Sequence, residues 1–528
     1  MAPAVQIRTP PLARKQHPLT RTSLRLGTLA AAAALVLTAC GESAEPPAET
    51  SPTEGNDDAT TEELSPEIII GSTNEPSTLE RNRGGTSGVR QTMTRNVYES
   101  LGGIDVDGEI YPALAEDWSI SEDGLTYTFD LREDVTFHDG TPFTSADVVW
   151  SLSEIIAEES GSARRGDLLV MEEITAVDEH TVEIQLSEPS RSLIFNIASE
   201  TIVKDGDLEL TADNGTGPYR FVEWVQGSFL TLERYDDYWG EPALNEGVTF
   251  EFFTDTTALN NALATGRLDL VIAQDSPDQL AQFEDNPDFV VTEGTSTTKQ
   301  LWAFNNSIEP FGDTRVRQAL YRAIDREAIL DAVWAGRGQL IGSMVPPADP
   351  WYVDLAGVHA YDPDSARELL EEAGVENLSI TVDYIAGDVT EIVAQQLQSD
   401  LAAIDVTLNL NPIDSAVWYE RIYTNHDFET TIQSHVNPRD VLWYANPDFY
   451  WGYDSADFQE LVARAEAASS DDEQVDLLRA ANELLAEDAA SAWLYLVPQI
   501  RVAAAGVSGF SENQATEAFY VAEIVKES

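Results

Sequence analysis

The stretch that decides the fold runs from Ala113 to Leu152 and reads ALAEDWSISEDGLTYTFDLREDVTFHDGTPFTSADVVWSL. Its first half predicts a β-hairpin, with a short strand over 118–121, a turn containing Gly124, and a strand over 125–131 in which apolar and polar residues alternate. A second turn, His138-Asp139-Gly140, precedes a helix that we expect to begin at Ser145. Thr144 and Asp147 have the spacing of a capping box at the start of that helix.

The same residues resemble the signature segment of the family 5 extracellular solute-binding proteins of ABC importers, the peptide- and nickel-binding group. That signature reads LAxxWxxSxDGxTYTFxLRxxVxFHDGxPFxAxDVxxS, and nearly every position is met. Further blocks resemble the family, among them GTGPY from Gly215, NNSIEPFGDTRVRQALYRAIDREAIL from Asn305 and YDPDSARELLEEAG from Tyr361. The resemblance covers roughly residues 67–505. It implies a protein that binds and delivers solutes without transforming them.

The resemblance implies an α/β protein with the two-lobed periplasmic-binding-protein fold, type II, in the large peptide-binding subclass. Lobe one is expected over 67–298, with an extra subdomain at about 98–205, lobe two over 299–497, and a return to lobe one over 498–528. The residues themselves predict a parallel strand–helix–strand unit between Ser379 and Leu410. They also predict an amphipathic helix over 313–334, interrupted near Asp325, and a further helix capped by Asp362.

The first 66 residues predict an export signal and a tether. Five Lys and Arg residues and no acid precede Gly27, and the apolar run that follows to Ala39 is too short to span a bilayer. It ends in Leu37-Thr38-Ala39-Cys40, which resembles a lipobox, so we expect residues 1–39 to be a lipoprotein signal peptide and Cys40 to be lipidated. Residues 40–66 are rich in Pro, Ser, Thr and acids, which is typical of a disordered tether. The expected location is the extracytoplasmic face of the cell membrane.

The charge of the chain excludes one class of partner. The net charge is −63, with 93 acidic residues against 30 Lys and Arg. A chain this acidic cannot neutralise phosphates, so we expect no nucleic-acid partner. Cys40 is the single cysteine of the sequence, which rules out an intramolecular disulfide and a CxxC metal site.

The sequence gives little support to an enzyme. It contains no HExxH, GxSxG, P-loop or dinucleotide-binding motif, and the glycines of 84–88 have the wrong spacing for a nucleophile elbow. His138 lies in a turn that the family shares, so we expect it to hydrogen-bond that turn. His426 and His435 flank a predicted strand, and two isolated imidazoles are weak support for a metal site. We expect no catalytic residue, no metal and no cofactor.

Candidate ligand contacts come from the resemblance and from the aromatic residues. In the family, the loop after the first strand of lobe one lines the cleft between the lobes, in agreement with the rule for open α/β sheets. In the second lobe, the segment Trp443–Trp451 reads as a loop whose aromatic side chains are hard to bury together, and large pockets are commonly lined in this way. The cleft candidates are Asn74, Arg83, Gly85, Trp302, Asn305, Trp418, Ser434, His435, Arg439, Asp440, Trp443 and Tyr450.

The solute is the open question. In the peptide-binding branch, an aspartate four residues before the proline of a GWxxDxxDP-like segment pairs with the α-amino group of the ligand. With Pro438 as the anchor, that position holds Ser434, which cannot supply a charge-assisted hydrogen bond to an ammonium. Either Asp440 or another acid replaces it, or the ligand is not a free-amino peptide. Arg83 and Arg439 could instead pair with a carboxylate.

These observations together predict a monomeric, membrane-tethered lipoprotein without enzymatic activity. It would capture an oligopeptide-like solute between two lobes and deliver it to ABC permease subunits. Two alternatives stay open at this point. The same fold could bind a non-peptide solute, such as an oligosaccharide or a metal chelate. The chain could also be a secreted hydrolase, for which the sequence shows no nucleophile–base pair.

Overall fold

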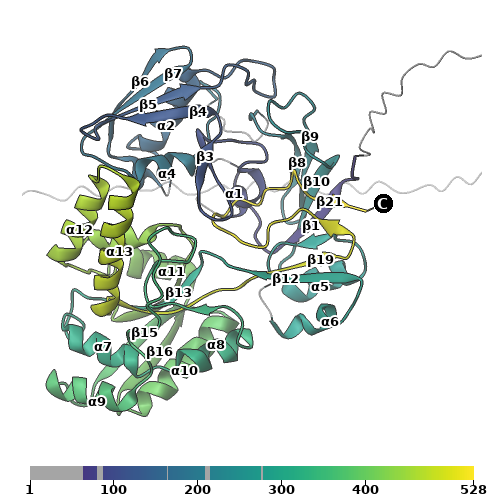
Figure 1. The fold of residues 1–528 in the computed structure, drawn as a ribbon. Helices are drawn as coiled ribbons and strands as arrows, with labels where there is room; N and C mark the ends of the chain where they lie inside the picture. Colours follow the sequence, from purple (N-terminus) through teal and green to yellow (C-terminus); the bar gives the residue numbers. More distant parts are fainter. Residues whose placement is uncertain (1–63, 80–86, 163, 208–213, 275–276, 528) are drawn as a thin grey trace, which may run out of the picture. The chain divides into compact units, whose positions relative to one another are not determined.

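The computed structural model describes residues 64–79, 87–162, 164–207, 214–274 and 277–527, and within these ranges the chain is a mixed α/β protein (Figure 1). The expected signal peptide, Cys40, most of the tether, Arg83 and Gly85 lie outside the described residues. Three large sheets are accompanied by two small ones. The small sheets pair β2 (Gly102–Ile104) with β3 (Ile110–Pro112), and β20 (Val507–Ser508) with β21 (Val525–Lys526).

A seven-stranded sheet forms the centre of lobe one. Its strands, in spatial order, are β12 (Phe289–Gly294), β19 (Gln499–Ala504), β11 (Leu270–Val271), β1 (Ile68–Ser72), β10 (Gly247–Phe252), β9 (Phe229–Arg234) and β8 (Tyr219–Val225). β1 runs parallel to β10 and β11, and Ile68 and Ile70 are fully buried. The helices α5 (Thr256–Ala264) and α6 (Ala281–Glu284) pack against strands of this sheet.

A four-stranded antiparallel sheet contains the segment quoted at the outset. Its strands are β4 (Ala115–Ile120), β5 (Thr126–Leu131), β7 (Thr181–Leu186) and β6 (Met171–Asp178), and the accompanying helices are α2 (Ser145–Ile156), α3 (Arg165–Leu168) and α4 (Leu193–Ala198). The predicted hairpin is confirmed, because β4 and β5 are joined by a turn in which Gly124 has a φ of 71°. The predicted helix also begins at Ser145, and the Thr144 N–H donates to Asp147 Oδ2 at 2.7 Å.

A six-stranded sheet forms the centre of lobe two. In spatial order it contains β14 (Gln339–Leu340), β18 (Ser491–Leu496), β13 (Lys299–Phe304), β17 (Thr430–His435), β15 (Ser379–Ile385) and β16 (Thr407–Ile413). The predicted parallel unit is confirmed: β15 and β16 are parallel neighbours, joined through α10 (Asp388–Ala402). The predicted break near Asp325 separates α7 (Thr314–Arg322) from α8 (Arg326–Trp334), and Asp325 caps α8. Asp362 caps α9 (Pro363–Glu372), also as predicted.

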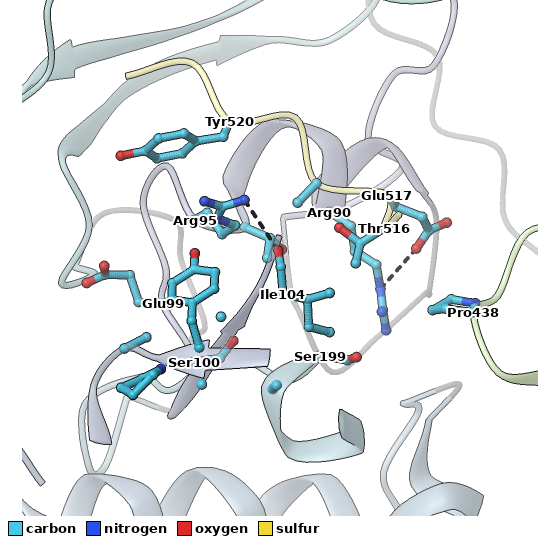
Figure 2. Close-up of a pocket in the computed structure, with 18 of the residues that line it drawn as sticks. Arg90, Arg95, Glu99, Ser100, Ile104, Ser199, Pro438, Thr516, Glu517 and Tyr520 are labelled. Atoms are coloured by element: carbon cyan, nitrogen blue, oxygen red, sulfur yellow. Dashed lines mark hydrogen bonds and ion pairs between the residues drawn. The ribbon is translucent and has the colours of Figure 1, made fainter. Parts of the chain in front are cut away.

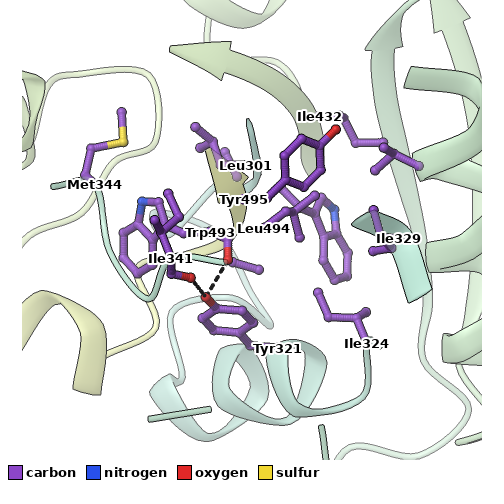
Figure 3. Packing of buried hydrophobic residues seen from close by; sticks show 14 of the residues in the cluster. Leu301, Tyr321, Ile324, Ile329, Ile341, Met344, Ile432, Trp493, Leu494 and Tyr495 are labelled. Atoms are coloured by element: carbon purple, nitrogen blue, oxygen red, sulfur yellow. Dashed lines mark hydrogen bonds between the residues drawn. The ribbon is translucent and has the colours of Figure 1, made fainter. Parts of the chain in front are cut away.

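The core of lobe two lies between this sheet and its helices (Figure 3). Apolar side chains from β13, β17, β18, α7 and α8 meet there, and the large rings among them are buried almost completely. The Tyr321 hydroxyl donates to the carbonyl oxygen of Trp493 at 2.6 Å, so a polar group at the centre of the core is satisfied. The six-stranded sheet is therefore packed against a well-buried core.

The remaining elements connect and flank the two lobes. They are α1 (Ser87–Met93), α11 (Ser415–Trp418), a π-helical turn (Tyr419–Thr424), two 3₁₀ turns (Pro277–Gln279 and Asp440–Ala445), α12 (Ala456–Glu466) and α13 (Asp471–Glu487). The chain leaves the seven-stranded sheet at the end of β12 and enters the six-stranded sheet at Lys299, and it returns between β18 and β19. Within the described ranges, none of the helices combines the length and the apolar character that crossing a membrane requires.

Candidate functional site

A cavity of about 200 Å³ lies between lobe one and a loop of lobe two (Figure 2). Lobe one supplies most of its wall, from α1, the β2–β3 hairpin, α4 and the C-terminal segment around 516–520. Lobe two supplies Asn437 and Pro438, which follow β17 directly. Because the wall comes from both lobes, a molecule in this cavity would contact both of them.

The lobe-two side of the cavity is held by a buried ion pair. Lys299, the first residue of β13, places its Nζ 2.8 Å from Asp440 Oδ1, and both side chains are almost completely inaccessible to solvent. The same Nζ donates to the carbonyl oxygen of Asn437 at 2.7 Å. The position of Asn437 and Pro438 is therefore fixed by a charge pair under the loop, at the strand where the chain enters lobe two.

Three arginines line the cavity, and two of them are paired with acids. Arg90 lies 3.5 Å from both Glu200 and Glu517. Arg164 pairs with Asp167 at 3.3 Å and donates to Asn196 Oδ1 at 2.9 Å. Arg95 lies close to the rings of Tyr111 and Tyr520, which also line the cavity. The cavity is thus rich in guanidinium groups, in a chain with three acids for each cation.

Glu99 is the most strongly perturbed acid of the cavity wall. Its carboxylate accepts hydrogen bonds from the Tyr238 hydroxyl at 2.7 Å and from Trp239 Nε1 at 2.8 Å. Burial raises the pKa of Glu99 to about 7, although these two hydrogen bonds and the charge of Arg95 act in the opposite direction. Burial also raises the pKa of Glu517, against the opposing charges of Arg90 and Arg164.

Several sequence-predicted site residues lie in the core of lobe two and do not line this cavity. Trp302 is fully buried in β13, and Trp418 donates through Nε1 to Thr431 Oγ1 at 3.0 Å. Asn305 uses its side chain to hold the chain at 426–428 through two backbone carbonyls. The expectation that the aromatics of Trp443–Trp451 resist burial is wrong for three of them, because Tyr444, Tyr450 and Trp451 are buried, with Trp451 stacked on Tyr444 and tilted against Tyr450. A 3₁₀ turn at Asp440–Ala445 folds the segment back on itself and makes this packing possible.

The other predicted residues that the structure describes do not line the cavity either. Asn74 donates to Ser87 Oγ at 2.8 Å and so ties the loop after β1 to α1. Ser434 is exposed on β17 and donates to Gln300 Oε1 at 2.7 Å. His435 is hydrogen-bonded to the Tyr450 hydroxyl at 2.9 Å. Arg439 lies over the ring of Phe195, with its guanidinium carbon 3.8 Å from the ring centroid.

Two of these residues reach across to lobe one. Phe195, under Arg439, belongs to α4 of lobe one, and Trp443 donates through Nε1 to Oδ1 of Asp167, a residue of α3, at 3.2 Å. Asp440, the acid that could replace the aspartate at the Ser434 position, is buried and forms an ion pair with Lys299. The described segment from Ser434 to Asp440 contains no other acid.

Sequence reasoning missed the residues that line the cavity, among them Arg90, Arg95, Glu99, Tyr111 and Tyr520. They come from a helix end, two short strands and the C-terminal segment, and no spacing in the sequence relates these pieces. One signal was available: Arg90 and Arg95 fall in a short segment of a chain that has very few cations.

For a metal, the described part of the chain offers no cluster of three or more His, Cys, Asp or Glu side chains.

Comparisons with known proteins agree with this architecture. Residues 109–451 match the family described as bacterial extracellular solute-binding proteins, family 5 Middle. A glutathione-binding protein, GsiB of Pectobacterium atrosepticum, is 30% identical over 338 residues, which are 62% of this chain and 65% of that protein. Among solved structures, AgaA from A. tumefaciens R10 in complex with agropinic acid has a TM-score of 0.74 at 26% identity, covering 88% of this chain and 99% of that one. CtaP of Listeria monocytogenes, an ABC transporter substrate-binding protein, has a TM-score of 0.78 at 25% identity, covering 88% and 100%.

Proposed function

This chain belongs to family 5 of the bacterial extracellular solute-binding proteins, a family of transport proteins and not of enzymes, and we propose that it captures a small peptide-like solute between its lobes for delivery to ABC permease subunits. The cavity between the lobes carries the proposal. It has walls from both lobes, a volume of about 200 Å³ and several charged groups. Ordinary small-molecule sites measure roughly 300–1,000 Å³, so the solute belongs at the short end of the peptide range.

The mechanism that we propose is closure of the lobes around the solute. Lobe one and lobe two are joined by two strand connections, β12 to β13 and β18 to β19, which can act as hinges. A solute that contacts Pro438 on one side and the β2–β3 hairpin on the other favours the closed form, because those contacts exist together only when the lobes are close. We assign lobe one to 67–298 and 498–528, its extra subdomain to about 98–205, and lobe two to 299–497.

We also propose that the protein is a monomeric lipoprotein anchored through Cys40 on the extracytoplasmic face of the membrane. The basic segment, the apolar run and the sequence Leu37-Thr38-Ala39-Cys40 support this assignment. Replacement of Cys40 by Ser should release the protein from the membrane fraction, and the mass of the wild-type protein should include a lipid. A soluble, unlipidated wild-type protein would contradict the anchor.

A non-peptide solute is the second candidate, and one observation favours it. Ser434 and Asp440 cannot receive an ammonium, the first because it is neutral and the second because Lys299 occupies it. The structural neighbour named above holds agropinic acid. A peptide with a modified amino end, an oligosaccharide or a metal chelate could each bind without an acid at that position.

Native mass spectrometry of the purified protein tests the proposal, followed by thermal unfolding with added solutes. The panel contains glutathione, di- and tripeptides, tetra- to hexapeptides, short oligosaccharides and nickel–histidine. A solute that binds only the folded protein raises the melting temperature as its concentration rises. We expect glutathione or short peptides to do so, without being consumed. If only sugars or chelates stabilise the protein, the result supports the second candidate and contradicts the peptide-like solute. Turnover of any solute would contradict the binding role.

A further inference from the structure

Arg95 has a backbone conformation that is unusual for a residue with a side chain. Its φ is 66°, in the left-handed region that residues other than glycine rarely adopt. The conformation is fixed from both sides, because Arg95 N donates to the Tyr98 carbonyl at 2.7 Å and Val97 N donates to the Met93 carbonyl at 2.8 Å. Non-glycine residues in this region are often found where a side chain must be aimed at a functional site. Here the side chain is aimed into the cavity (Figure 2).

The guanidinium group of Arg95 is surrounded by aromatic rings. Its central carbon lies 4.5 Å from the ring centroid of Tyr520 and 5.6 Å from that of Tyr111. Tyr111 in turn rests on Gly103, where a Cβ atom would approach the ring to 2.1 Å. Glycine at position 103 is therefore required for the ring of Tyr111 to stay where it is. Contact with aromatic rings helps to hold the planar group, and a guanidinium group in such contact still has N–H donors along its edge.

The hydrogen-bonding capacity of Arg95 is almost unused. Nη1 donates to the Ile104 carbonyl at 3.4 Å, a long contact for a hydrogen bond. A guanidinium group has five N–H donors, and among the residues that the structure describes no acid forms an ion pair with this one. Arg90 and Arg164 line the same cavity, and each has its own acid. Arg95 is thus the half-buried arginine of the cavity that forms no ion pair with a described acid, although its charge acts on Glu99.

We propose that Arg95 is the anion-binding residue of the solute site and that the solute presents a carboxylate to it. This inference rests on the proposed function, because it assigns a ligand chemistry to the same cavity. The edge of a guanidinium group matches a carboxylate in two parallel hydrogen bonds. Glu99 and Glu517 also line the cavity, so a group with a single negative charge fits better than a doubly charged phosphate. The solute is therefore a small carboxylate-bearing molecule, recognised at its acidic end by lobe one.

The test measures the affinity of wild-type and variant proteins by calorimetry, with three kinds of probe. The first is the di- and tripeptides of alanine together with glutathione, with each alanine peptide supplied as the free acid and as the C-terminal amide. The second is glutarate, and the third is inorganic phosphate. The variants are Arg95→Gln, which removes the charge, and Arg95→Lys, which keeps the charge but loses the planar fork. Arg220→Gln is the matched control, because Arg220 also lies over a tyrosine ring, that of Tyr235 at 4.3 Å, and donates to a carbonyl, but outside the cavity.

We expect the free acids to bind more tightly than the amides, and Arg95→Gln to weaken the free acids by about 10- to 100-fold, which removes the preference. The affinity of Arg95→Lys for the free acids should lie between the affinities of the wild type and of Arg95→Gln. The affinity of Arg220→Gln should match that of the wild type. If glutarate binds in an Arg95-dependent manner and the peptides do not bind, the result supports the carboxylate site and contradicts the peptide-like solute of the proposed function. If peptides bind but acids and amides bind equally, the proposed function stands and this inference is overturned. Preference for phosphate, or binding of none of the carboxylates, also overturns it.

Discussion

At the scale of single residues, Glu99 makes the stability of the protein depend on pH. Burial raises the pKa of its carboxyl group from 4.5 to about 7 in the folded protein. Between these two values the folded state holds a proton that the unfolded state has released, so raising the pH favours unfolding. The contribution lost across this window is on the order of 3 kcal/mol.

We therefore expect Glu99→Gln to change the pH dependence of the free energy of unfolding. The free energy of the variant minus that of the wild type should increase from pH 5 to pH 8, because only the wild type must release a buried proton. Denaturant titrations at several pH values measure this difference. Glu122→Gln, at an exposed turn of the same lobe, is the control and should show a flat difference. A flat difference for Glu99→Gln as well would show that the carboxyl group titrates as an ordinary exposed acid.

The buried pair of Lys299 and Asp440 leads to a second prediction at this scale. Removing one member leaves the other charge buried without its partner, which typically costs about 3–5 kcal/mol. We expect Lys299→Met to lower the free energy of unfolding by this amount, since the ion-pair partner that Asp440 keeps among the described residues is His435, whose Nδ1 lies 3.5 Å away. The double variant Lys299→Met/Asp440→Leu should recover most of the loss, as measured by denaturant unfolding. A double variant less stable than the single one would contradict this account.

At the scale of elements, the start of α2 joins two parts of the chain. Asp147 accepts from the Thr144 N–H through Oδ2 at 2.7 Å and from the Asp205 N–H through Oδ1 at 2.8 Å. We expect Asp147→Ala to lower the free energy of unfolding by about 1–2 kcal/mol, the usual effect of losing a helix cap. Glu154→Ala, on the exposed face of the same helix, is the control and should change stability by less than about 0.5 kcal/mol. Equal effects of the two variants would contradict a specific role for the cap.

The elements of this protein differ in how far the sequence predicts them. The hairpin and helix of residues 113–152, the break at Asp325 and the parallel unit of β15 and β16 follow from local alternation, caps and turn residues, and the structure confirms them. Trp443–Trp451 could not be predicted in this way, because Tyr444, Tyr450 and Trp451 are buried by long-range packing that no local pattern records. Arg95 was missed for a similar reason: a positive φ at a residue other than glycine leaves no trace in the sequence.

At the scale of the whole molecule, fold and site depend on different parts of the chain. The segment from Ala113 to Leu152 identifies the architecture, yet of its residues only Ala113 lines the cavity. The lining comes from short segments that the fold brings together, such as the end of α1 and the chain around Tyr520. A signature that stabilises a scaffold can therefore reveal the class of a binding protein while leaving its solute undetermined.

The contacts between the lobes lead to the last prediction. Glu466, the final residue of α12 in lobe two, accepts hydrogen bonds from Ser190 Oγ at 2.8 Å, Ser192 N at 3.1 Å and Ser192 Oγ at 2.6 Å, all in lobe one. The neighbouring Arg191 forms an ion pair with Asp471. These contacts lie away from the cavity, so they can stabilise the closed arrangement of the lobes without touching the solute.

We expect Glu466→Ala to shift the equilibrium towards an open form by about 1–2 kcal/mol, because it removes charge-assisted hydrogen bonds that exist only when the lobes meet. The radius of gyration of the solute-free protein, measured by small-angle X-ray scattering, should increase. The affinity for the solute should fall by about 5- to 30-fold, since part of the binding free energy must then close the lobes. Glu460→Ala, exposed on the same helix, is the control and should change neither quantity. An unchanged radius and an unchanged affinity in Glu466→Ala would show that the cavity, and not this bridge, holds the lobes together.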